Sequence, residues 1–170
     1  ALLDAGSYTV SLVRLVMGSA PDWVTAHPVW ASSGVDMRCT GTLIWADGRS
    51  AQISCAMDVG YHRHAHIVCS QGSIETEYLN HTADGPGHPL GYQASQLRVR
   101  RSAASNVPLE TVRSATGSGF RFCAEAFADV VARGDTAAID RAAAASVDIA
   151  ATLEALALSA RAGRMVDLSE

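Results

Sequence analysis

The segment MRCTGTLIWADGRSAQISCAM, residues 37–57, decides the fold. Two runs rich in β-forming residues flank Ala46-Asp47-Gly48-Arg49, and an Asp-Gly pair between such runs is a strong hairpin signal. Alternate residues of a strand point to opposite faces. One face of the first run is apolar and carries Met37, Cys39, Leu43 and Trp45; the other carries Arg38, Thr40 and Thr42. We therefore predict a hairpin with one side more apolar than the other.

Helices are predicted at both ends of the chain. Residues 1–18 are apolar on nearly all sides and end at Gly18 and Pro21, so we expect this helix to lie between two surfaces. The spacing predicts an amphipathic helix over 120–133 and an Ala-rich helix over 140–162. In the middle of the chain, further strands are predicted over 66–69, 74–77, 93–101 and 108–115. A loop is predicted over 81–91.

This order, one helix, five to seven strands and two helices, predicts an α+β fold. We expect a single domain over residues 1–170, with a large, open, predominantly antiparallel or mixed sheet and its helices on one face. A sheet face left without helices often meets another subunit, so we expect a homo-oligomer, such as a dimer, formed through it.

Composition excludes several functional classes. The formal net charge is −4 and all 13 basic residues are Arg, scattered along the chain, which argues against a nucleic-acid-binding surface. Without Lys, the chain cannot form a Schiff base. We find no signal peptide and no apolar run long enough to cross a membrane, and expect a cytoplasmic protein. We expect all four cysteines to be buried free thiols: Cys39, Cys55, Cys69 and Cys123.

Several motifs resemble the C-terminal domain of the Gfo/Idh/MocA oxidoreductases, the glucose–fructose oxidoreductase and inositol dehydrogenase family. The opening ALLDAGSYTVSLVRLVMGSAPDWVTA is similar to the family's helix with D-x-G-x-H or D-x-G-x-Y. The hairpin, CSQGSIETE and FRFCAEAFADVVARGDT also resemble family segments, although Cys69 and Ser70 replace the common glycine-threonine. The most specific likeness is the tail SVDIAATLEALALSARAGRMVDL.

The resemblance implies a fold like the dihydrodipicolinate reductase C-terminal domain and a role as the substrate-binding and dimerisation half of an enzyme. Family members bind NAD or NADP in an N-terminal Rossmann domain, which also supplies a lysine near the nicotinamide. This chain offers only Gly85-x-Gly87 in a loop, without strand–helix context. We therefore expect the cofactor to be bound outside this chain, and the chain alone to be inactive.

Asp4 and Tyr8 are one helical turn apart, so their side chains lie on one face. From the residues alone, a surface pair or a packed Tyr with a satisfied hydroxyl is the simpler interpretation. The resemblance implies that Tyr8 transfers a proton at the substrate carbinol oxygen, because a subset of members has Tyr where most have His. Asp4 would orient a substrate hydroxyl or the active-site network. Many His-type members carry an Asp where this chain has Ser11, so substrate specificity does not transfer.

His62, His64 and His66 alternate and on a strand would share one face. A zinc site is imaginable, but polar surface or a hydrogen-bond network is the simpler interpretation, and the resemblance implies no metal. His62 or Arg63 could approach the substrate.

The remaining distinctive residues are expected to be structural. For Trp23, Trp30 and Trp45 we expect packing, with sugar stacking as the alternative. A solvated edge, or else an interface ion pair, is expected for Arg98, Arg100 and Arg101. Glu154 and Ser159 are expected to support the last helix.

Two hypotheses about function follow. In the first, the chain is the substrate-binding and oligomerisation half of an NAD- or NADP-dependent oxidoreductase acting on a carbinol of a sugar, cyclitol or diol. In the second, it is a non-catalytic module that binds a polyol or dimerises. An encoded strand, glycine-rich turn and helix upstream of Ala1 would favour the first.

Overall fold

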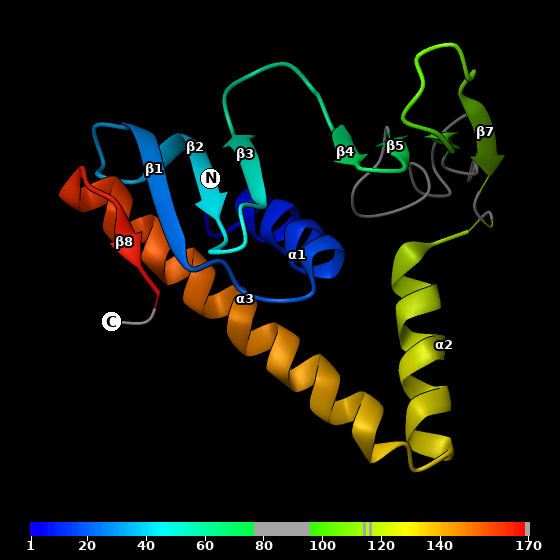
Figure 1. Ribbon diagram of the computed structural model, residues 1–170. Coiled ribbons are helices and arrows are strands. Elements are labelled where there is room, and N and C mark those ends of the chain that lie inside the picture. The colour runs from blue at the N-terminus through cyan, green and yellow to red at the C-terminus, as the bar shows by residue number, and fades with distance from the viewer. Residues whose placement is uncertain (77–95, 114, 116, 169–170) are drawn as a thin grey trace. The chain divides into compact units, whose positions relative to one another are not determined.

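The computed structural model describes residues 1–76, 96–113, 115 and 117–168 (Figure 1). The chain divides into two compact units, Ala1–Gly60 with Thr136–Glu170, and Tyr61–Asp135. The loop predicted over 81–91 lies outside the described residues. The expectation of a single domain stays a prediction.

The first unit contains a four-stranded antiparallel sheet in the order β3-β2-β1-β8. Its strands are β1 (Trp23–Trp30), β2 (Asp36–Ile44), β3 (Ser50–Ala56) and β8 (Val166–Asp167). β2 and β3 form the predicted hairpin, closed by a 3.0 Å hydrogen bond from Trp45 N to Arg49 O. Gly48 in this turn has a φ of 89°, a backbone conformation that glycine adopts without strain.

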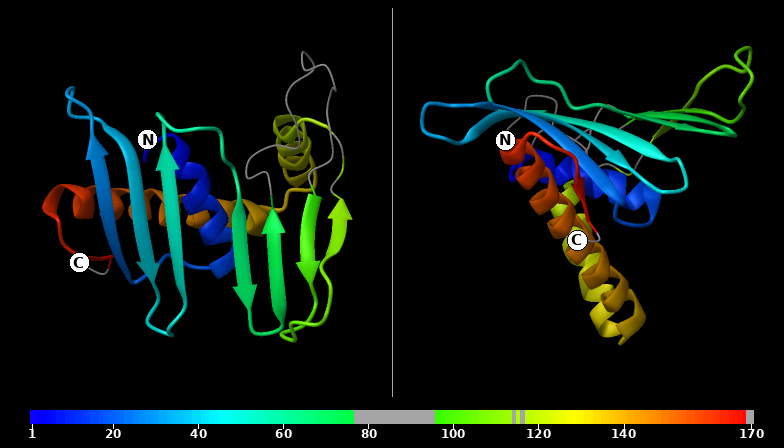
Figure 2. Two further views of the ribbon diagram at one scale, coloured as in Figure 1. Left: turned by 90° about the horizontal axis from the view of Figure 1, so that it is seen from above. Right: turned by 60° about the vertical axis from the view of Figure 1, so that its left-hand side comes forward.

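Two helices cover one face of this sheet, α1 (Ala5–Met17) and α3 (Thr136–Ala162) (Figure 2). α1 packs on β3, and α3 packs on β1 and β8. The predicted alternation in β2 is confirmed, because Cys39 and Leu43 are buried while Arg38 and Thr40 are exposed. The apolar side of the hairpin is buried beneath the helices and contributes Cys39, Leu43, Trp45, Ile53 and Cys55 to this unit's core.

α3 is buried only in its C-terminal half. Its buried residues are Thr152, Leu153, Ala155, Leu156 and Ser159. By length and composition alone, the helix is apolar enough to cross a membrane, contrary to our expectation for this chain. However, α3 packs against β1, β8 and α1, and the buried apolar residues of its C-terminal half belong to the core of the first unit.

Ser159 completes the sheet where β8 ends. β8 pairs with β1 only through Trp23↔Asp167 and Val24↔Val166. Continuing this register by two residues would bring Ala26 opposite Arg164. The Ser159 hydroxyl bridges these two residues, accepting from Ala26 N at 3.0 Å and donating to Arg164 O at 2.6 Å. A buried side chain thus satisfies backbone groups that a longer strand would pair.

The second unit contains another four-stranded antiparallel sheet, in the order β4-β5-β6-β7. Its strands are β4 (Ala65–Cys69), β5 (Gly72–Thr76), β6 (Gln96–Arg100) and β7 (Glu110–Arg113). The predicted amphipathic helix is present as α2 (Gly119–Ala132), but none of its residues is buried. The predicted α+β class with antiparallel strands is confirmed.

The cysteines differ from our expectation in half of the cases. Cys39 and Cys55 are buried and lie directly opposite each other on β2 and β3. Burial raises the pKa of the Cys55 thiol to about 11 and also raises the pKa of Cys39. Cys69 and Cys123 are exposed, so the prediction that all four thiols are buried is wrong. Both lie on elements whose apolar residues have few covering neighbours among the described residues.

Replacing Ser159 with Ala is expected to lower the free energy of unfolding by about 1–3 kcal/mol, because the buried Ala26 N–H then has no acceptor. The measurement is denaturant unfolding followed by tryptophan fluorescence, since all three tryptophans lie in the first unit. Ser146→Ala is the control: Ser146 is exposed and its hydroxyl donates only to Ala142 O within the same helix. Equal stability of the two variants would contradict the bridging role of Ser159.

Thiol labelling of the native chain at neutral pH is expected to modify Cys69 and Cys123 and to leave Cys39 and Cys55 intact. The buried pair is shielded and stays protonated, because both thiol pKa values are raised. Mass spectrometry of peptides identifies the modified positions, and labelling in denaturant provides the reference in which all four react. Native modification at Cys55 as fast as at Cys69 would show that the β2–β3 pair is not shielded.

Candidate functional site

Asp4 and Tyr8 lie on the face of α1 that points away from the sheet. The opposite face contains Gly6 and Val10, both buried. A Cβ on Gly6 would lie 3.3 Å from Cys55 Sγ and 3.0 Å from Leu2 Cδ1. The glycine therefore lets the helix approach β3 closely, and this close approach directs Asp4 and Tyr8 outward.

Both side chains of the predicted site are exposed. The Tyr8 side chain is 43% exposed. Asp4 is the N-cap residue of α1, yet its carboxylate makes no capping hydrogen bond; Ser7 donates to its main-chain oxygen at 2.6 Å instead. Within the described part of the chain, neither the carboxylate nor the phenol hydroxyl makes a hydrogen bond or ion pair. The structure thus brings both residues onto one surface, and both side chains are available to a ligand.

The start and the end of α1 are held by separate contacts. At the start, Leu2 N donates to Asp36 Oδ2 at 2.5 Å, which ties the chain before the helix to β2. Near the end, Arg14 Nε lies 2.6 Å from Asp148 Oδ2 of α3, and both side chains are mostly buried. These contacts fix the helix that carries Asp4 and Tyr8. No local pattern predicts the Arg14–Asp148 pair, because its members are 134 residues apart.

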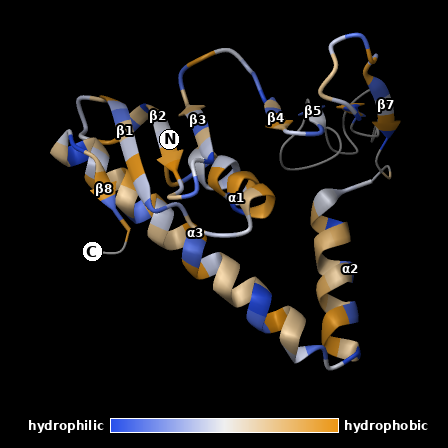
Figure 3. Ribbon diagram, viewed as in Figure 1, coloured by the Kyte–Doolittle hydropathy of each residue, from blue (hydrophilic) through white to orange (hydrophobic). Residues whose placement is uncertain are grey.

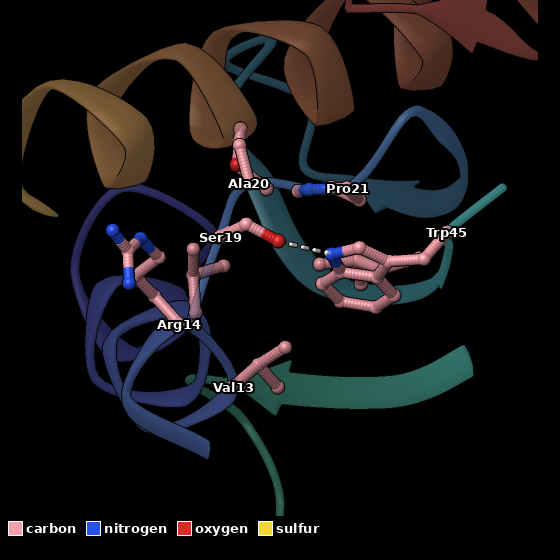
Figure 4. A pocket seen from close by; sticks show the side chains of 9 residues that line it. Val13, Arg14, Ser19, Ala20, Pro21 and Trp45 are labelled. Atoms are coloured by element: carbon pink, nitrogen blue, oxygen red, sulfur yellow. Dashed lines mark hydrogen bonds between the residues drawn. The ribbon is translucent and has the colours of Figure 1, made fainter. Parts of the chain in front are cut away.

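A shallow hollow, too tight to admit a water molecule, lies beside the end of α1 (Figure 4). Its lining includes Val13, Arg14, Ser19 and Trp45, and the Trp45 Nε1 donates to Ser19 Oγ at 3.1 Å. Asp4 and Tyr8 are not among its lining residues. The hollow is a feature of core packing, and the candidate site is an open surface.

The histidines do not gather into a metal site in the described part of the chain. His66 lies on β4, but His62 and His64 precede that strand, so a shared strand face for all three is wrong. The rings of His62 and His64 stack with centroids 4.2 Å apart. No group of three or more metal-ligating side chains is found among the described residues.

The tryptophans and arginines singled out in the sequence mostly have structural partners. Trp45 is buried, as expected for packing, and Trp23 Nε1 donates to Asp167 Oδ2 at 3.0 Å. Arg98 Nη1 pairs with Glu75 Oε2 of the neighbouring strand at 3.0 Å, and Arg101 pairs with Glu110. These exposed ion pairs contribute little stability.

A nicotinamide dinucleotide does not fit the described residues. Dinucleotide sites of the Rossmann type need a parallel strand–helix–strand unit with a glycine-rich turn at the helix N-terminus. Every strand pair among the described residues is antiparallel. The described residues therefore form no nucleotide site of the Rossmann type.

Comparison with known proteins identifies similar chains. Residues 1–75 match the family model described as the GFO/IDH/MocA C-terminal domain. D-xylose 1-dehydrogenase (NADP(+)) 2 of Haloferax volcanii is 29% identical over 168 residues, which are 98% of this chain and 47% of the relative. The chain thus spans about half the length of this curated relative.

Solved structures share the fold at lower identity. The aldose-aldose oxidoreductase of Caulobacter crescentus, in complex with glycerol, has a TM-score of 0.70 and 17% identity over 98% of this chain and 47% of its own. KijD10, a 3-ketoreductase from Actinomadura kijaniata in complex with NADP, has a TM-score of 0.72 and 19% identity, with 94% and 47% covered. At these identities the likeness shows the fold.

Proposed function

We propose that this chain, whose residues 1–75 match the GFO/IDH/MocA C-terminal domain, supplies the substrate side of an NAD- or NADP-dependent oxidoreductase. The substrate is a carbinol of a sugar, cyclitol or diol. The observation that carries this proposal is the likeness along 98% of the chain to a D-xylose dehydrogenase, together with an exposed Asp4–Tyr8 pair on α1.

Oxidation of a carbinol removes a proton from its oxygen and a hydride from its carbon. Tyr8 exchanges a proton with the carbinol oxygen in this proposal. The side chain is exposed, its hydroxyl has no partner in the described part of the chain, and a phenol can give or accept that proton. A phenol is a weak acid, so proton removal at neutral pH needs a nearby cation. No cation–π contact to Tyr8 is found among the described residues, and a lysine of the nucleotide-binding lobe is our proposed source of that cation.

Asp4 positions the substrate in this proposal. Its carboxylate is exposed one turn before Tyr8 and is not used to cap the helix. A carboxylate accepts hydrogen bonds from the hydroxyl groups of a polyol. Binding through a second hydroxyl would hold the reacting carbinol oxygen near the phenol, which explains why the two residues share one helical face.

The nucleotide-binding lobe lies outside this chain in our proposal, since the described residues do not fit a dinucleotide. The relatives are about twice as long as this chain, which leaves room for such a lobe. A homo-oligomer formed through the helix-free face of the sheet completes the proposed assembly. In the first unit that face is polar and includes Thr40, Gln52 and Ser54, all exposed.

Replacing Tyr8 with Phe in the complete gene product is expected to lower kcat by about 100-fold or more, because general acid–base catalysis is lost. Turnover is measured by absorbance of the reduced nicotinamide, with NAD and NADP and with D-xylose, inositol and glycerol as substrates. Unaltered turnover in Tyr8→Phe would show that Tyr8 does not transfer the proton.

Tyr8→His is the matched variant, because an imidazole also transfers protons. We expect this variant to retain more activity than Tyr8→Phe and to show a pH profile displaced to lower pH, since imidazole titrates below phenol. Equal thermal stability of wild type and both variants would show that the losses arise at the site. A complete product that oxidises or reduces none of the polyols would count against the oxidoreductase proposal and favour a binding module.

A further inference from the structure

The two faces of the sheet in the second unit differ in chemical character. Residues directly opposite each other in an antiparallel sheet share a face, as do alternate residues of one strand. In Figure 3, hydrophilic and hydrophobic residues accordingly alternate along β7. The register of the four strands places a set of apolar side chains together on one face: Ile67, Ile74, Leu97, Val99 and Val112.

The opposite face carries most of the sheet's charge. His66, Glu75 and Arg98 lie in one row across β4, β5 and β6. Arg100 lies two residues after Arg98 on β6, and Arg113, on β7, lies diagonally across from Arg98. We name this surface, which these five residues define, the basic face of the second sheet.

Positive charge on the basic face exceeds negative charge. Glu75 Oε2 lies 3.0 Å from Arg98 Nη1, so this carboxylate has a partner on the same face. The other carboxylate of these strands, Glu110, lies on the apolar face. Among the described residues, neither Arg100 nor Arg113 forms an ion pair. The excess is local, because the whole chain has a formal net charge of −4.

The guanidinium of Arg100 is poorly satisfied. Its Nη1 lies 3.4 Å from Ser105 O, which is long for a hydrogen bond, and its Nε is buried without a hydrogen-bond partner among the described residues. A buried charged donor without an acceptor is costly, so a ligand that accepts from this guanidinium would stabilise the site. Ser73 lies directly opposite Arg100 on the same face and adds a hydroxyl donor. An oxyanion is the ligand that this combination of donors fits.

We propose that the basic face binds a small molecule with two neighbouring phosphate groups, held by Arg98, Arg100 and Arg113. Strand geometry separates the Cα atoms of Arg98 and Arg100 by about 7 Å, a spacing from which long side chains can converge on adjacent phosphates. Arg98 takes part by exchanging Glu75 for the ligand. The inference is independent of the oxidoreductase proposal, because none of these residues belongs to the candidate site.

Two larger occupants fit these observations less well. A second copy that presented the same face would bring like charges together, because a two-fold interface pairs a surface with itself. A nucleic acid needs a longer basic surface, whereas these strands contain only four or five residues and the chain is acidic. A compact polyanion is therefore the occupant that the charge pattern favours.

Arg100→Gln tests the inference, with Arg121→Gln as the matched control. Arg121 also belongs to the second unit, but it lies on α2, where its side chain is 74% exposed and pairs with Glu125. The measurement is calorimetric titration of the complete gene product with inorganic pyrophosphate, with NADP present to fill any dinucleotide site. We expect binding that weakens at least tenfold in Arg100→Gln and is unchanged in Arg121→Gln. Equal weakening in both variants, or no binding by the wild type, would overturn the inference.

Glu75→Gln supplies a variant whose expected effect has the opposite sign. Removing the carboxylate releases Arg98 and lessens repulsion, so pyrophosphate is expected to bind roughly threefold more tightly or better. A variant that merely misfolds cannot gain affinity, and unchanged or weaker binding in Glu75→Gln would contradict the proposed role of Arg98. Citrate bound as tightly as pyrophosphate would show that the face selects charge alone and would refute the phosphate assignment. Loss of a dimer in Arg100→Gln without loss of pyrophosphate binding would assign the face to a second copy and overturn the choice of ligand.

Discussion

The close packing of α1 on β3 is the contact on which the candidate site depends. Gly6 makes this contact possible, because any larger residue would meet Cys55 and Leu2. Once the buried side of the helix is fixed, its 3.6-residue period determines where the remaining side chains point. The exposure of Asp4 and Tyr8 is therefore a consequence of core packing on the other side of the helix. Their position depends on residues that never touch a substrate.

Much of the fold could be predicted because the decisive signals were local. The Asp47-Gly48 turn and the alternation across β2 predicted the hairpin, and both are present. Helical periodicity predicted α2 closely, but it could not predict that none of its residues would be buried. Burial depends on what other segments place over a surface, and for the same reason the exposure of Cys69 and Cys123 was missed.

Long-range contacts set the limit of prediction for the rest. The bridge that Ser159 makes between Ala26 and Arg164 joins groups far apart in the sequence. The ion pair of Arg14 with Asp148 likewise links two helices without a sequence signal. For the candidate site, spacing alone placed Asp4 and Tyr8 on one face, and the structure places both on the surface. Their chemical roles came from the family resemblance, since a carboxylate and a phenol at this spacing are also compatible with an ordinary surface.

An outward-facing pair is also the arrangement that the two-lobed enzyme proposed above would require. A carboxylate and a phenol buried within one domain would need partners in that domain, because unsatisfied buried polar groups are costly. Such partners would compete with a substrate for the same hydrogen bonds. On the exposed side of α1, the described residues provide no competing partner, so the hydrogen-bonding capacity of both side chains is free for a ligand such as the proposed polyol. In the function we propose, a second lobe that covers the pair would remove water only after the substrate has taken its place.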